Sequence, residues 1–91
     1  MRDDRFEWDD RKAASNLRKH GITFEDARST FDDMASVDEE DADPDEGRWK
    51  RIGMAAPGLL AVTYTERGSR IRIISARKAT RHEQDSYNRQ A

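Results

Sequence analysis

Residues 70–80 read RIRIISARKAT, and this stretch decides the architecture that we expect for the chain. Its first part alternates arginine with isoleucine, which is typical of a strand with one polar and one apolar face. Thr80 and Glu83 form the Thr-x-x-Glu pattern of a capping box, so we expect a helix to begin directly after the strand. Four cations on the strand favour a surface that meets phosphate or carboxylate groups: Arg70, Arg72, Arg77 and Lys78.

Two further strands precede this one, and short turns connect all three. Residues 49–56 form the first, and residues 59–65, the most apolar segment of the chain, form the second. Pro57-Gly58 marks the turn between them, and residues 66–69 mark the turn before the third strand. Such short connections predict an antiparallel meander with residues 59–65 at its centre.

The N-terminal half predicts short strands and two helices. Residues 6–8 fit an edge strand, and Asp9 is a suitable N-cap for a helix over residues 10–20 that ends at Gly21. Thr23 starts a second helix, which ends near residues 32–33 and completes a helical hairpin. Ala13, Ala14 and Leu17 are expected to form the core-facing stripe of the first helix. A further brief strand is expected at residues 34–37.

This order of elements predicts an α+β fold in a single domain that covers residues 1–91. The fold consists of an N-terminal strand, a helical hairpin, an antiparallel meander of three or four strands and a C-terminal helix. Because strands and helices are segregated along the chain, we expect the helices to pack on one face of the sheet.

The composition excludes several classes of protein. The chain has 91 residues, of which 34% are hydrophobic and 40% charged, so its core is small and its stability margin is thin. It contains no cysteine, which excludes a disulfide framework and a thiolate metal site. Its apolar runs are too short for a membrane span or a signal peptide, so we expect a soluble, cytoplasmic protein without a membrane partner.

Charge is divided unequally between the two halves of the chain. Residues 1–47 hold 7 Lys/Arg and 16 Asp/Glu, whereas residues 48–91 hold 10 Lys/Arg and 3 Asp/Glu. Either the basic half binds a polyanion or the two halves neutralise each other across the fold, and the composition favours neither. The acidic residues within 38–47 are expected to form a solvated loop, because they are a dense run of like charges. The loop is not an EF-hand, because its acids lack the spacing of that motif.

Several motifs, read together, extend over most of the chain. They are Phe6-Glu7-Trp8-Asp9, Asn16-Leu17-Arg18-Lys19-His20-Gly21, Phe24-Glu25-Asp26-Ala27, Ile52-Gly53, Tyr64-Thr65-Glu66-Arg67, residues 72–79 (RIISARKA) and Glu83 with Tyr87. In these motifs the chain resembles the BrnT family, the toxin half of a bacterial type II toxin–antitoxin pair. The resemblance implies a RelE-like fold and a metal-independent ribonuclease, without a cofactor, that cleaves RNA and arrests translation. It also implies a cognate antitoxin, BrnA, that binds the toxin tightly. Contact with operator DNA is then made only through this antitoxin.

RNA cleavage without a metal has three requirements. The 2′-hydroxyl must lose a proton, the charge developing on the phosphate must be stabilised, and the 5′-oxygen must gain a proton. Arginine suits the second task because its planar guanidinium stays charged and binds phosphate through two hydrogen bonds. For this task we favour Arg67, Arg72 and Arg77, with Lys78 in support.

Two alternatives bear on these arginines. Each of them can instead form a surface ion pair, which is worth roughly 0–1 kcal/mol. Strand alternation also places Arg72 and Arg77 on opposite faces of one strand, unless a β-bulge shifts the pattern between them.

Three side chains are candidates for proton transfer: His20, Lys19 and Glu66. Imidazole is the side chain that changes charge near neutral pH, but His20 also suits the end of a helix as a cation. Lys19 is a phosphate ligand, a base or a solvated cation. Glu66 is a base, a partner that holds Arg67, or a turn residue.

Further contacts to RNA are expected from Lys78, Arg70, Arg48, Arg81 and Trp8. A tryptophan that stacks on a base contributes about 1–3 kcal/mol. Trp8 and Trp49 either stack in this way or belong to the core, and the scarcity of large apolar residues favours the core. Two isolated histidines provide no metal-binding motif.

Two functions therefore compete. The first is an endoribonuclease toxin whose cationic surface is covered by an antitoxin that is rich in Asp and Glu or carries an amphipathic helix. The second is a non-catalytic binding module that pairs with a DNA-binding partner or holds an acidic protein segment. The second gains support because no residue stands out as a poised base.

Overall fold

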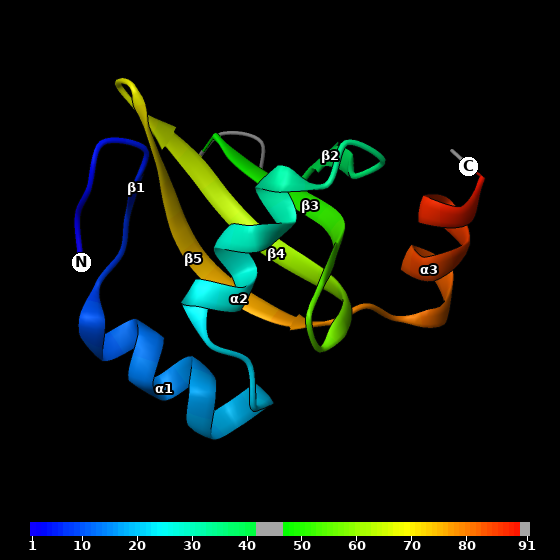
Figure 1. Cartoon of the computed structure of the whole chain (residues 1–91), viewed down its shortest axis with the longest axis horizontal. Coiled ribbons are helices and arrows are strands. Elements are labelled where there is room, and N and C mark those ends of the chain that lie inside the picture. Colours follow the sequence, from blue (N-terminus) through cyan, green and yellow to red (C-terminus); the bar gives the residue numbers. More distant parts are fainter. Residues whose placement is uncertain (42–46, 90–91) are drawn as a thin grey trace.

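The computed structural model describes residues 1–41 and 47–89 and shows one sheet with three α-helices around it (Figure 1). Residues 42–46, the middle of the predicted acidic loop, lie outside the described residues. The elements in chain order are β1 (Phe6–Glu7), α1 (Asp10–His20), α2 (Phe24–Ser29), the 3-10 helix η1 (Thr30–Asp32), β2 (Val37–Glu40), β3 (Arg48–Ala55), β4 (Gly58–Arg67), β5 (Arg70–Lys78) and α3 (Arg81–Asn88).

The sheet has five strands in the order β1-β5-β4-β3-β2. Strands β2 to β5 pair with their sequence neighbours in antiparallel fashion, whereas β1 pairs with β5 in parallel. The predicted α+β class and the predicted meander are therefore confirmed, and the sheet as a whole is mixed.

The hydrophobic core lies between the sheet and the N-terminal helical hairpin. Phe24 of α2 meets Trp8 edge to face with ring centroids 5.7 Å apart, and Phe6 meets Phe31 in the same way at 5.3 Å. Each large apolar side chain buried here contributes about 1.5–3 kcal/mol to folding. The buried members of this core are Phe6, Trp8, Ile22, Phe24, Ala27, Leu60, Val62, Ile73 and Ala76.

The first helix presents a different face to the sheet from the one expected. Leu17 is 48% exposed and Ala14 is exposed, whereas the polar residue Asn16 is buried. The Asn16 amide donates to the carbonyl of Ala76 at 2.8 Å and accepts from its N–H at 3.0 Å. Because β1 pairs only with the first part of β5, this amide takes the place of a neighbouring strand at the β5 edge.

A β-bulge lies in the β4–β5 pair. Tyr64 pairs with Ile73 and Thr63 pairs with Ser75, so Ile74 has no partner in this ladder. The bulge shifts the alternation along β5, and Arg72 and Arg77 consequently face the same side of the sheet. This is the irregularity that the sequence left open.

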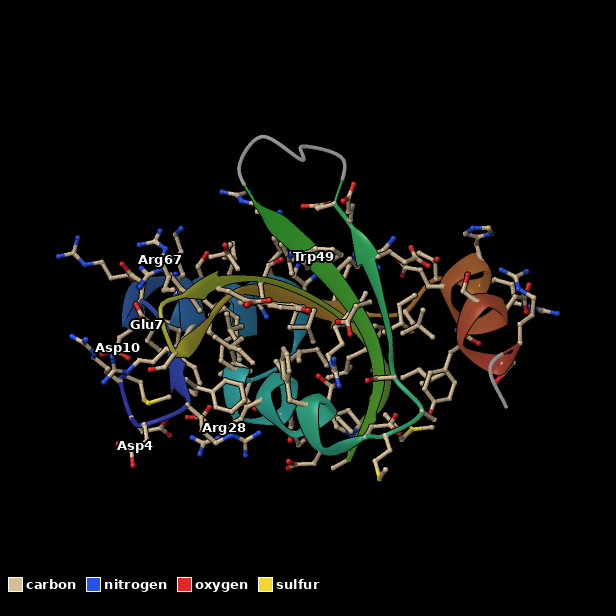
Figure 2. The ribbon with its side chains drawn as sticks, turned by 90° about the horizontal axis from the view of Figure 1, so that it is seen from above. Asp4, Glu7, Asp10, Arg28, Trp49 and Arg67 are labelled. Atoms are coloured by element: carbon tan, nitrogen blue, oxygen red, sulfur yellow. The ribbon has the colours of Figure 1, made fainter. Side chains whose placement is uncertain are left out.

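That side of β3–β5, which carries Lys50, Thr65, Arg72 and Arg77, is called here the open face. The opposite side is the core face, where the Arg51 guanidinium lies 4.5 Å from the Phe31 ring centroid. In Figure 2 the helix α2 lies on one side of the sheet only.

The third helix does not share the core face with α2. It contacts β3, and its Glu83 reaches Lys50 on the open face at 2.9 Å. The expectation that all helices pack on one face is therefore wrong, because α3 carries a charged anchor rather than an apolar stripe. No helix among residues 1–41 and 47–89 is long and apolar enough to cross a membrane.

Part of the predicted acidic loop is a strand. Residues 38–40 belong to β2, which begins at the last residue of the strand predicted for 34–37. Asp38 pairs with Arg51 at 2.8 Å and Glu39 with Lys50 at 3.6 Å. Opposite charges across the two strands offset the low strand propensity of these acids, and a composition-based reading does not detect such pairs.

Candidate functional site

The open face carries a hollow of about 360 Å³ that is lined mainly by cations. Four elements contribute to it, namely α1, β3, β4 and β5. This cationic hollow is lined by Lys12, Arg48, Thr65, Arg67, Arg72 and Ile74.

Strand register explains why these side chains meet. Arg48, Thr65 and Arg72 are direct neighbours across β3, β4 and β5, so two guanidinium groups flank one threonine in a single row. Arg67 follows Thr65 by two residues and therefore points to the same face. Figure 2 shows Arg67 on the opposite side of the molecule from Arg28 of α2.

Two carboxylates among the described residues lie close to these cations. The Asp9 carboxylate, which caps α1, is near enough to Lys12 and Arg72 for their charges to act on it. Glu7 of β1 accepts a hydrogen bond from Arg72 at 2.7 Å, and both side chains are largely buried. By contrast, the Arg67 side chain is exposed and makes no hydrogen bond or ion pair within residues 1–41 and 47–89. Glu7 thus orients one arginine, and the described residues place four cations and two carboxylates at or beside the hollow.

A second, smaller hollow of about 190 Å³ adjoins the first. Lys12 and Ile74 line both of them. The exposed side chains of Lys19 and His20, two of the predicted proton-transfer candidates, line the second hollow and not the first.

Arg77 lies on the open face but outside both hollows. Its guanidinium donates to the two Glu83 carboxylate oxygens at 2.7 and 2.9 Å, and Lys50 adds a third cationic contact. These hydrogen bonds and the Thr80 N–H hold the pKa of the buried Glu83 carboxyl far below its usual range, and the same contact raises the pKa of Arg77. The geometry therefore favours the ion-pair alternative for Arg77 over a phosphate ligand.

Most of the other predicted site residues lie elsewhere. Trp8 is 5% exposed within the core, so its ring is not available for base stacking. Glu66 alternates with Arg67 and faces away from the cationic hollow. The remaining three donate within the fold: Lys78 to the Pro57 carbonyl, Arg70 to the Asp3 carbonyl and Arg81 to Asp85.

A comparison with protein-family models adds an independent finding. The model for the ribonuclease toxin BrnT of type II toxin–antitoxin systems matches residues 8–83. The chain belongs to the BrnT family. A search of curated proteins found no match.

The BrnT match covers every residue that lines the two hollows, together with Arg77 and Glu83. A type II toxin has an antitoxin as its partner, so an antitoxin belongs to the biology of this chain. The family assignment also names RNA cleavage as the activity of its members, which the cations of the hollow suit chemically.

Sequence reasoning missed Lys12, Thr65 and the structural role of Asn16. Lys12, Ser15 and Lys19 are spaced at i, i+3 and i+7, and that spacing identifies a polar helix face. Thr65 carries no such signal, because its position in the row depends on the register of three strands.

The hollow offers hydrogen-bond donors and positive charge rather than a base. Guanidinium and ammonium groups bind a phosphate and stabilise charge that develops on it. The Thr65 hydroxyl donates to the Gly47 carbonyl at 2.9 Å and is thereby engaged. The described residues that line the first hollow include no imidazole, whereas His20 lines the second hollow.

Proposed function

We propose that this BrnT-family chain is a metal-independent endoribonuclease that arrests translation and is neutralised by a cognate BrnA-like antitoxin. The observation that carries the proposal is the meeting of Lys12, Arg48, Arg67 and Arg72 at one hollow without a carboxylate among the described lining residues. The helical hairpin, the antiparallel meander and the C-terminal helix support a RelE-like fold.

The proposed reaction needs only groups of the chain and the RNA. The 2′-oxygen attacks the adjacent phosphorus as its proton leaves, the bond to the 5′-oxygen breaks, and that oxygen takes up a proton. Arg67 and Arg72 stabilise the negative charge on the phosphate, with Arg48 and Lys12 beside them. His20 lines the adjoining hollow and is the candidate for moving the protons, whereas Lys19 beside it is a candidate phosphate ligand.

The antitoxin proposal follows from the same charges. A segment rich in Asp and Glu that covers the cationic hollow would complement its positive charge and exclude RNA from it. Operator DNA then enters the complex through the antitoxin alone, because this chain directs its open cationic surface to the antitoxin.

A cleavage assay in EDTA tests the activity. Purified full-length chain without antitoxin is incubated with a labelled single-stranded RNA, beside the variants Arg67→Gln and Arg18→Gln. Arg18 is an exposed cation of α1 that lines neither hollow, so it is a matched control for loss of one charge. We expect wild-type and Arg18→Gln chains to cleave and Arg67→Gln to be slower by about tenfold or more.

Intact RNA under all conditions would overturn the ribonuclease proposal and favour the non-catalytic binding module. Cleavage that appears only when Mg²⁺ replaces EDTA would overturn metal independence. Equal rates for Arg67→Gln and Arg18→Gln would place the reaction away from the cationic hollow.

A further inference from the structure

The second hollow extends the cationic surface along α1, beyond the residues assigned to the phosphate under attack. Ser15, Asn16, Lys19, His20 and Ser75 line it in addition to the two residues that it shares with the first hollow. The shared residues are Lys12 and Ile74, so the two hollows adjoin at this point.

Helix geometry places the lining residues of α1 in one stripe. Lys12, Ser15 and Lys19 follow the i, i+3 and i+7 spacing of a single helix face. Asn16 lies in the same stripe and hydrogen-bonds to both backbone groups of Ala76, which holds this face against the edge of β5. The backbone of this face of α1 is therefore held in place beside β5.

We infer that the two hollows form one groove for single-stranded RNA, in which Lys19 binds a second phosphate, further along the strand than the one held by Arg67 and Arg72. This inference rests on the proposed function and deepens it. Lys12 and Lys19 are seven residues apart, which is about 10 Å along the helix axis, whereas a stacked strand advances about 3.4 Å per nucleotide. The groove thus spans about three nucleotides.

The chemistry of the lining selects this ligand. Cations, hydroxyls, an amide and an imidazole line the groove, and no carboxylate does so among the described residues. A repeating anion with sugar hydroxyls fits such a lining better than an isolated phosphate, because the positive charges recur along the groove. The groove is assigned to a single strand, and a duplex is the competing ligand in the test below.

Binding of a strand that cannot be cleaved tests the inference. An octanucleotide with 2′-O-methyl groups lacks the attacking hydroxyl, so its affinity is measured without cleavage, by fluorescence anisotropy in EDTA over a series of salt concentrations. The full-length chain is compared with Lys19→Gln and with Arg18→Gln, which removes the same charge from another face of α1. Circular dichroism checks that each variant is folded.

Lys19→Gln is expected to weaken binding about three- to tenfold at low salt and to reduce the slope of log affinity against log salt by about 0.7, the value for one phosphate contact on a single strand. Arg18→Gln is expected to stay within about twofold of wild type. Equal effects of the two variants would overturn the groove, and so would a duplex that binds as tightly as the single strand.

The outcome is separable from that of the proposed function. A chain that binds the octanucleotide through Lys19 but leaves ordinary RNA intact would retain the groove and refute the ribonuclease. If the wild-type chain cleaves RNA but Lys19→Gln and Arg18→Gln bind the octanucleotide equally well, the ribonuclease proposal stands and the groove is refuted.

Discussion

Asn16 shows how one polar side chain can replace a strand. Its amide has two hydrogen bonds to the backbone of Ala76 and donates a third to the carbonyl of Ile22 at 3.0 Å. All of these contacts are buried, so the loss of the amide would leave backbone groups of the β5 edge without partners.

Asn16→Leu is therefore expected to lower the free energy of unfolding by about 1–3 kcal/mol or more, the cost of a buried polar group left unsatisfied. Leu17→Ala, at a half-exposed neighbouring position, is expected to change it by less than about 1 kcal/mol. Urea denaturation followed by circular dichroism measures both values. A larger loss for Leu17→Ala would restore the apolar stripe that the sequence pattern predicts.

Glu7 tunes the charge of the cationic hollow. Its carboxylate lies 2.7 Å from the Arg72 guanidinium and so reduces the attraction between the hollow and a phosphate. At about 4–5 Å in water, one unit charge is worth about 1 kcal/mol, or roughly a fivefold change in affinity.

Glu7→Gln is thus expected to tighten the binding of the uncleavable octanucleotide up to about fivefold at low salt, with little effect at high salt. Asp10→Asn, which removes an exposed acid from the first turn of α1, serves as the control. Weaker binding of Glu7→Gln would mean that orientation of Arg72 outweighs the charge.

Individual residues were predictable where their chemistry is independent of partners. The sequence indicated Arg67, in the turn before the third strand, and Arg72, on that strand, because a guanidinium stays charged and binds phosphate through two hydrogen bonds. Trp8 was a candidate for base stacking or for the core, and it lies in the core. Arg77 was a candidate phosphate ligand on the same grounds as Arg67 and Arg72, but its surroundings pair it with Glu83. The β-bulge and the acid on a later helix set those surroundings, and neither is visible in a local pattern.

At the scale of elements, α3 is held to the sheet by charge. Glu83 is 4% exposed. Its carboxylate accepts hydrogen bonds from Arg77 and from the backbone N–H of the N-cap residue Thr80, and it forms an ion pair with Lys50. The capping box was readable from the sequence, whereas the two cations come from strands that the sequence does not align with the helix.

Glu83→Gln is expected to destabilise the fold by about 1.5–3 kcal/mol, because hydrogen bonds between charged groups are lost and two cations remain close together. Asp85→Asn removes an acid from the exposed Arg81 pair on the same helix and is expected to cost less than about 0.5 kcal/mol. Thermal unfolding of both variants makes the comparison. Equal stability of the two would show that the network does not hold α3.

The same carboxylate makes stability depend on pH. Hydrogen bonds from Arg77, the Thr80 N–H and Lys50 lower the pKa of Glu83 relative to the unfolded chain. A lowered pKa means that the contribution is complete above the ordinary pKa of a glutamate, about 4.3, and is lost as the pH falls below it. We expect the free energy of unfolding to decline between about pH 4.5 and pH 2 more steeply in wild type than in Glu83→Gln.

The order of elements was largely predictable, because caps, turns and apolar periods are local. The observed bounds of α1, its Asp9 cap and the left-handed Gly21 agree with the pattern. The strand β2 and the position of α3 were not predictable, because each depends on charges that meet only after folding.

At the scale of the whole molecule, the two charge interpretations each hold for part of the surface. Asp38 and Glu39 of β2 pair with Arg51 and Lys50 of β3, as expected if the two halves of the chain neutralise each other across the fold. Among the described residues the cationic hollow has more cations than carboxylates around it, as the polyanion interpretation requires. A chain with a net charge of −2 can therefore still present a local site for a phosphate backbone.

The central claim is that RNA binds on the open face, between α1 and the paired ends of β3, β4 and β5. Amide NMR of the full-length chain, titrated with the 2′-O-methyl octanucleotide, locates the contact directly. The account predicts the largest shifts at Lys12, Thr65, Arg67, Arg72 and Ile74. Shifts confined to α3 or to the edge strand β2, with the amides around the hollow unchanged, would contradict it.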